Sequence, residues 1–135
     1  MKHDLTKATF IIPIKIESDD RLRNVITSIC FLLDNFDTTV MVKEVDDQSR
    51  FVMEALPQII EFCDNIDGLL HSFEHSTAPT FHRQRVLNDM IMEAKTEIVV
   101  NYDCDILLPV ESYLSSYNSI LDNEADVVYP YGDGE

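Results

Sequence analysis

Two aspartates separated by one residue, Asp103 and Asp105, follow an apolar segment and are the side chains best suited to chemistry. Two carboxylates this close repel each other, so a strand end is a costly place for the pair. A hard divalent cation removes that conflict. Mg²⁺ or Mn²⁺ held by one or two carboxylates keeps coordination positions for water and phosphate oxygens. The pattern therefore predicts a metal site that would bridge a diphosphate.

The elements that position this pair follow from hydrophobic spacing. Strands are predicted at residues 8–14, 38–45, 69–73, 97–102 and 126–129. Helices with apolar residues at helical spacing are predicted between them: after the capping residue Ser18, around Val52 to Cys63 with Pro57 in the first turn, after the loop 77–80, and from Pro109. This alternation predicts an α/β fold, a three-layer α/β/α sandwich with a mostly parallel central sheet.

Polar clusters fall where three of these strands end, at residues 15–17, 46–49 and 103–105. Pro13 also indicates that the first strand stops nearby or lies at a sheet edge. Ligands of parallel α/β sheets bind beyond the carboxyl ends of the strands, near the switch in strand order. The three clusters are therefore expected to share one ligand site.

Composition bounds the function class. The 135 residues suffice for a single domain, and the 25 acidic against 10 basic residues disfavour nucleic acid or an anionic membrane as partner. Three cysteines without paired spacing indicate a reducing compartment. No apolar run is long enough to form a transmembrane segment, so a cytoplasmic protein is expected, one that could act at the inner face of the membrane.

The motifs resemble those of GT-A glycosyltransferases of the family 2 type. The segment 11–14 ends the first strand as in that family, and 46–49 stands in place of its Asp-Asp-Gly-Ser turn. Val86-Leu87-Asn88 occupies the place of its Ala-Arg-Asn segment, with Ala94 six positions after the Asn. Asp103 stands fifteen positions after that Asn, as in the family. The resemblance covers nearly the whole chain, but only the front half of a typical catalytic domain.

The resemblance implies a site for a nucleoside-diphosphate sugar and sugar transfer to a glycan or lipid-linked acceptor, as in polysaccharide biosynthesis. Asp46 would accept a hydrogen bond from the nucleotide base. The backbone at Pro13 and Ile14 would lie under the base or ribose, and Asn88 would tie its helix to the diphosphate side. Asp103 would lie near the ribose or the metal.

Asp105 would be the main ligand of the Mn²⁺ or Mg²⁺ ion by the same resemblance. The family places its general base well downstream of Asp-x-Asp, whereas about thirty residues follow Asp105 here. The catalytic base is therefore unknown and expected to be absent. Residues 1–135 are interpreted as a nucleotide-sugar-binding domain, the N-terminal part of a longer glycosyltransferase domain. The alternative is a non-catalytic nucleotide-sugar-binding module. A truncated sheet edge would favour a homodimer.

Two departures from the family pattern concern its turn and its cation. Gln48 replaces the usual Gly, which would reshape the base pocket, and Leu87 stands where the family has Arg. Arg83 and Arg85 lie just upstream and could supply the missing charge to the diphosphate. The competing interpretation for either Arg is a surface ion pair.

Other chemistries fit less well. His71, His75 and His82 match no zinc-site spacing and are interpreted as surface or loop histidines. Cys104 is interpreted as a buried filler rather than a nucleophile. The chain has no Gly-rich phosphate loop. A phosphoacceptor receiver domain would need an acidic pair after the first strand, where the chain has residues 15–17, Lys-Ile-Glu.

Overall fold

The computed structural model describes residues 2–102 and 108–122. The strands are β1 (His3–Ile14), β2 (Phe36–Asp46), β3 (Leu69–His75) and β4 (Ile98–Asn101), and the helical elements are α1 (Asp19–Asn35), the π-helical turn η1 (Phe51–Ala55), α2 (Leu56–Phe62), α3 (Arg83–Glu93) and α4 (Val110–Leu121). Within these residues the strands form one four-stranded sheet in the order β3-β2-β1-β4, and every pairing is parallel. The predicted α/β fold with a parallel sheet is confirmed, while the predicted strand at 126–129 lies outside the described residues.

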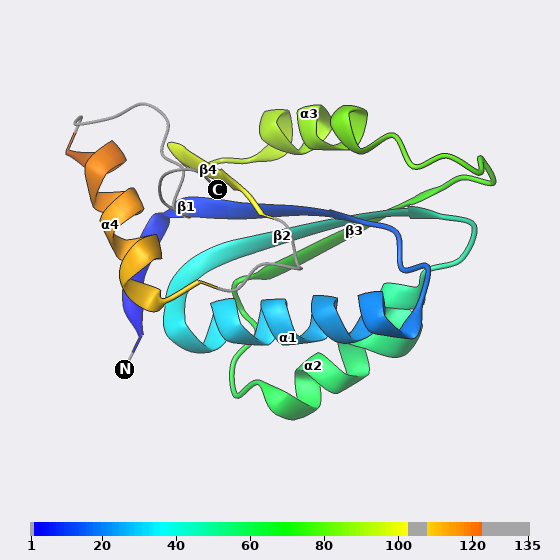
Figure 1. Cartoon of the computed structure of the whole chain (residues 1–135), viewed down its shortest axis with the longest axis horizontal. Helices are drawn as coiled ribbons and strands as arrows, with labels where there is room; N and C mark the ends of the chain where they lie inside the picture. Colours follow the sequence, from blue (N-terminus) through cyan, green and yellow to red (C-terminus); the bar gives the residue numbers. More distant parts are fainter. Residues whose placement is uncertain (1, 103–107, 123–135) are drawn as a thin grey trace.

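Helices cover both faces of the sheet (Figure 1). On one face, the large core cluster joins inward side chains of β1 and β2 to α1, η1 and α2. On the other face, a smaller cluster packs Val86, Leu87 and Met90 of α3 against Ile11 and Val45. This arrangement is compatible with the predicted three-layer sandwich.

The central strand β1 is longer than its apolar pattern predicts. Residues 8–14 are almost continuously buried, as expected for a parallel strand covered on both faces. The strand nevertheless begins at His3, because His3 pairs with Phe36 and Asp4 with Asp37 before the register shifts. Leu5, which is 1% exposed, is the one apolar residue of residues 3–7, so this extension has no repeating apolar pattern and its strand character depends on the neighbouring strand.

Pro13 lies in an interior strand and not at a sheet edge, so the edge interpretation is wrong and the strand-end interpretation is confirmed. The Tyr102 N–H donates to the Ile11 carbonyl at 3.1 Å, so odd-numbered residues of β1 direct their backbone groups toward β4. Because β4 ends at Asn101, level with Ile11, Pro13 lies beyond the last rung on that side. Its missing N–H costs no ladder hydrogen bond there.

The helix α1 begins and ends with identifiable caps. The Ser18 hydroxyl accepts a hydrogen bond from the Arg21 N–H at 3.1 Å, which confirms the predicted N-cap. At the other end, Phe36 is both the C-cap residue and the first residue of β2. The helix therefore passes into the strand without a connecting loop.

Three predicted helical faces need correction. Around α2 the buried residues are Phe51, Ala55 and the predicted Ile59 and Cys63, whereas Val52 and Ile60 are exposed, because the π-helical turn η1 rotates the apolar face. In α3 the predicted core residue Ile91 is 49% exposed. In α4, Tyr113 is buried as predicted, whereas the last predicted core residue, Leu121, is exposed.

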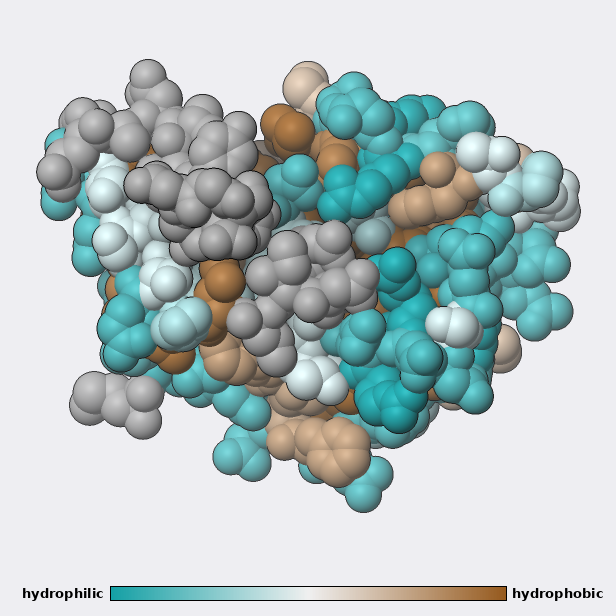
Figure 2. All heavy atoms as spheres, in the orientation of Figure 1, coloured by the Kyte–Doolittle hydropathy of each residue, from teal (hydrophilic) through white to brown (hydrophobic). Residues whose placement is uncertain are grey.

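Hydrophilic side chains dominate the described surface on the face shown in Figure 2, and hydrophobic ones appear there in small separate areas. Among the described residues, no helix combines the length and the apolar character that crossing a membrane requires. The prediction that these residues contain no transmembrane segment is confirmed to that extent.

Candidate ligand site at the carboxyl edge of the sheet

The order of the strands creates a switch point between β1 and β4. The chain runs from β1 to β2 and β3 in one direction and then returns to place β4 on the far side of β1. Ligands of open parallel sheets bind outside the carboxyl ends of the strands at such a point. The end of β4 at Asn101 is two residues before Asp103. The strand that leads into the Asp-x-Asp motif therefore ends at the switch point of the sheet.

The end of β1 supplies backbone rather than side chains. Pro13 is buried and in register with Lys43 of β2, and Ile14 is in register with Glu44. The Ile14 side chain is 2% exposed and belongs to the core cluster on the α1 side. Any contact of Ile14 with a ligand must therefore involve its main chain, which is the role predicted for it.

Asp46 ends β2 in a position that joins two loops. Its Oδ1 accepts a hydrogen bond from the Asp47 N–H at 2.8 Å, and its carbonyl accepts one from the Ser76 N–H at 2.8 Å. The half-buried side chain therefore belongs to a defined turn at the carboxyl edge. The remaining carboxylate oxygen is free of hydrogen bonds within the described residues, as a ligand-binding role requires.

Arg83, the first residue of α3, reaches the end of β4. Its Nη2 atom lies 3.5 Å from Asn101 Oδ1, and its side chain is exposed. A permanent cation therefore stands beside the strand end that leads into Asp103. A guanidinium in this position is suited to a phosphate oxygen.

Arg85 is engaged in ion pairs. Its guanidinium donates to both carboxylate oxygens of Glu74, at 2.8 and 3.2 Å, and to Asp89 at 3.1 Å. The bidentate hydrogen bond to Glu74, followed by that carboxylate's charge, raises the pKa of Arg85 above its ordinary value. Arg85 therefore forms the surface ion pairs of the competing interpretation, whereas Arg83 lies at the end of β4.

Asn88 lies on the exposed side of α3, where its Oδ1 accepts a hydrogen bond from Gln84 Nε2 at 3.0 Å. Among the described residues, no hydrogen bond joins Asn88 to Asp46 or Arg83. The predicted metal ligands Asp103 and Asp105 lie outside the described residues. Within the part that is described, no three His, Cys, Asp or Glu side chains are grouped in a way that could hold a metal ion.

Glu44, a buried acidic residue that the sequence patterns did not predict as part of the site, lies two residues before Asp46 and is 0% exposed. Its carboxylate accepts hydrogen bonds from the Ser49 hydroxyl at 2.6 Å and from the Phe51 N–H at 3.1 Å. The His71 Nε2 atom lies 3.8 Å from the same carboxylate, too far for a hydrogen bond. The only sequence feature that could have indicated the burial of Glu44 is that it is the single Glu in a strand rich in β-branched residues.

The sequence-based interpretation of His71 is wrong. This residue was predicted to be a surface or loop histidine, but it lies in β3, and its side chain is only 16% exposed. Its ring stacks on Phe51 with centroids 4.5 Å apart, and its Nε2 atom is buried without a hydrogen-bond partner. The ring is held there because its strand position faces the α1 side, level with Val42.

Glu44 should make the stability of the domain depend on pH. Burial raises the pKa of its carboxyl, but the nearby His71 ring, the Ser49 hydroxyl and the Phe51 N–H favour the ionised form and bring that pKa below its ordinary value. A carboxyl with a depressed pKa stabilises the fold above its unfolded pKa of about 4.3 and loses that contribution as pH falls through the folded value. We expect the free energy of unfolding to fall as pH drops below about 4.3, and to fall less in Glu44→Gln.

Urea unfolding at a series of pH values from 3 to 7 measures this dependence. The exposed Glu61 offers a matched control, because Glu61→Gln removes the same charge from the surface of α2. An acid dependence that is equal in Glu44→Gln and Glu61→Gln would contradict the assignment.

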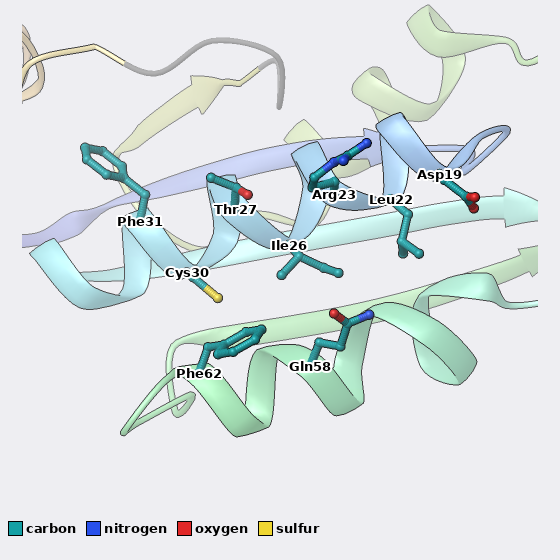
Figure 3. A pocket seen from close by; sticks show the side chains of 9 residues that line it. All are labelled: Asp19, Leu22, Arg23, Ile26, Thr27, Cys30, Phe31, Gln58 and Phe62. Atoms are coloured by element: carbon teal, nitrogen blue, oxygen red, sulfur yellow. The ribbon is translucent and has the colours of Figure 1, made fainter.

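A separate groove lies between α1 and α2 (Figure 3). It has a volume of about 710 Å³, and its lining includes Ile26, Cys30, Gln58 and Phe62. None of the predicted site residues contributes to it. This groove and the carboxyl edge of the sheet are therefore different features.

Comparison of the chain with protein-family models, with curated proteins and with solved structures found no match in any of the three. The resemblance to GT-A glycosyltransferases therefore remains one of motifs and spacing.

Proposed function

We propose that this chain is the sugar-donor-binding part of a GT-A-type glycosyltransferase. In this proposal it binds a nucleoside-diphosphate sugar with Mn²⁺ or Mg²⁺, and the sugar is transferred to a glycan or lipid-linked acceptor. The observation that carries the proposal is the position of β4 beside β1. That position brings the strand leading into Asp103 to the switch point of a parallel sheet, where such folds bind their ligands.

The residues at this edge divide into a nucleotide side and a phosphate side. Asp46 ends β2, next to the end of β1, and a carboxylate there can accept a hydrogen bond from a base N–H. The main chain at Pro13 and Ile14 would lie under the base or ribose. Arg83 and Asn101 stand on the β4 side, where the diphosphate would lie.

The proposed metal ligands are Asp103 and Asp105. Mg²⁺ and Mn²⁺ are commonly bound by one or two carboxylates together with phosphate oxygens and water, so two protein ligands suit such an ion. The ion, when bound, would neutralise charge on the leaving diphosphate. Arg83 would add a second positive charge to that side, which matters in a chain with a formal charge of -15.

Isothermal titration calorimetry of the chain with UDP, GDP and their sugars, each with and without Mn²⁺, tests the proposal. We expect metal-dependent binding of one of these ligands and much weaker binding of the corresponding nucleoside monophosphate, which lacks the diphosphate. No metal-dependent binding of any diphosphate would sink the proposal. A parallel assay for donor hydrolysis or sugar transfer distinguishes an enzyme from a module that only binds.

A further inference from the structure

We propose that Glu44 is a positioning residue that holds the turn of residues 46–49 in the shape needed for nucleotide recognition. The proposal rests on the function proposed above, because it assigns Asp46 to the nucleotide side of the site. Glu44 itself is fully buried and would not touch the ligand. It would act through the turn that follows its strand.

The hydrogen bonds of Glu44 hold the chain that leaves β2. Oε1 accepts from the Ser49 hydroxyl at 2.6 Å, and Oε2 accepts from the Phe51 N–H at 3.1 Å. The Ser49 hydroxyl oxygen in turn accepts from the Val52 N–H at 3.2 Å. A side chain in the strand thus fixes both the end of the turn and the start of η1.

The strand that carries this carboxylate is itself rigidly placed. Glu44 pairs in register with Ile14 of β1 on one side and with Phe73 of β3 on the other. Its main chain is therefore fixed relative to the ends of both neighbouring strands. The hydrogen bonds to the Glu44 carboxylate therefore hold the turn in a defined position relative to these strand ends.

Arg50 extends the same network to the loop after β1. Its Nη1 atom donates to the Ile16 carbonyl at 3.0 Å, and its guanidinium makes an ion pair with Glu54. In the chain, Arg50 lies between Ser49 and Phe51, which donate hydrogen bonds to the Glu44 carboxylate. Glu44 therefore orders the turn on which Asp46 stands and, through Arg50, the chain that follows Pro13 and Ile14.

The alternative is that Glu44 is only a tolerated polar residue in the core. A buried carboxylate is costly unless its hydrogen bonds are made, and an apolar residue of similar size is often no worse for stability. The α1-facing positions Val40 and Val42 of the same strand are apolar and 0% exposed. A charged residue at the next position of this face, which accepts hydrogen bonds from Ser49 in the turn and from the Phe51 N–H at the start of η1, is what a positioning role requires.

Glu44→Gln and Ser49→Ala test the role, because each removes part of the network while changing little volume. Ser49→Ala leaves the contact between Glu44 and the Phe51 N–H, and it carries the test if Glu44→Gln does not fold. The exposed substitution Glu61→Gln is the matched control. Two quantities are measured on the full chain: amide hydrogen exchange by residue, and the affinity for UDP and GDP with Mn²⁺ by calorimetry.

We expect exchange at residues 47–52 to be faster by on the order of tenfold in both variants, with no change in the middle of β1. We expect nucleotide affinity to fall by on the order of tenfold, as for other supporting groups behind a binding site. Faster exchange throughout the sheet would indicate a general loss of stability and would overturn the positioning role.

Loosened exchange at the turn with unchanged nucleotide affinity would overturn the link to the ligand site. If the unaltered chain binds no nucleotide, the proposed function fails. In that case the link to a nucleotide site fails with it, and the exchange data alone decide whether Glu44 orders the turn.

Discussion

Asp105→Ala should abolish metal-dependent nucleotide binding, which corresponds to a loss of affinity of more than about 100-fold. Removing a group that only supports a metal ligand typically costs about 10- to 100-fold, so removing the main ligand should cost more. The expectation rests on the Asp-x-Asp sequence pattern and on the position of β4, since Asp105 lies outside the described residues. Calorimetric titration with UDP or GDP in the presence of Mn²⁺ measures the effect.

Asp64→Ala is the matched control for this experiment. Asp64 is exposed in the segment between α2 and β3, which leads into the opposite, amino-terminal edge of the sheet. Its removal changes the net charge by the same amount but should leave nucleotide affinity unaltered. Equal losses in the two variants would show that net charge is responsible. Unfolding of Asp105→Ala, seen by circular dichroism, would show that this carboxylate is structural and is not a metal ligand.

Phe36→Ala should lower the free energy of unfolding by about 3–5 kcal/mol, the usual cost of deleting a large aromatic side chain from a core. Phe36 is 1% exposed, and its ring centroid lies 5.4 Å from Tyr113 and 6.3 Å from both Phe10 and Phe31. This ring therefore joins β1, α1 and α4 at the point where α1 passes directly into β2. A domain with a total stability of about 5–15 kcal/mol would lose a large part of it.

Phe62→Ala makes the same chemical change on the surface, because Phe62 is 62% exposed at the end of α2. We expect it to change stability by about 0.5 kcal/mol or less. Urea unfolding followed by circular dichroism compares the two variants. A loss below about 1 kcal/mol in Phe36→Ala would contradict the central packing role of this ring.

Arg83 and Arg85 have different partners in the fold, and the sequence does not predict this difference. Both residues were candidates for the phosphate cation, because they precede the predicted Asn88 segment by a few positions. Glu74 distinguishes their surroundings, since it is eleven residues away from Arg85 in the chain but contacts its guanidinium at 2.8 Å. No local sequence pattern predicts the contact between Arg85 and Glu74.

Glu44 and His71 show the same limit for buried polar groups. Each lies in a strand that carries other polar residues, such as Lys43 beside Glu44 and Ser72 beside His71, so the polar pattern does not show which of them is buried. They come together because β2 and β3 pair with Val42 level with His71 and because Phe51 stacks on the imidazole ring. The proximity of Glu44 and His71 therefore depends on the register between two strands that are far apart in the chain.

The local elements and the kind of fold can be predicted from the order of the residues. Helical and strand spacing and the Ser18 cap are short-range signals, and within the described residues they predicted the alternating elements and the parallel sheet correctly. The tertiary structure alone decided that β4 lies beside β1, that β1 extends back to His3, and that η1 turns Val52 outward. The physical reason is that strand order and register are set by contacts between residues far apart in the chain, which leave no repeating pattern within any one segment.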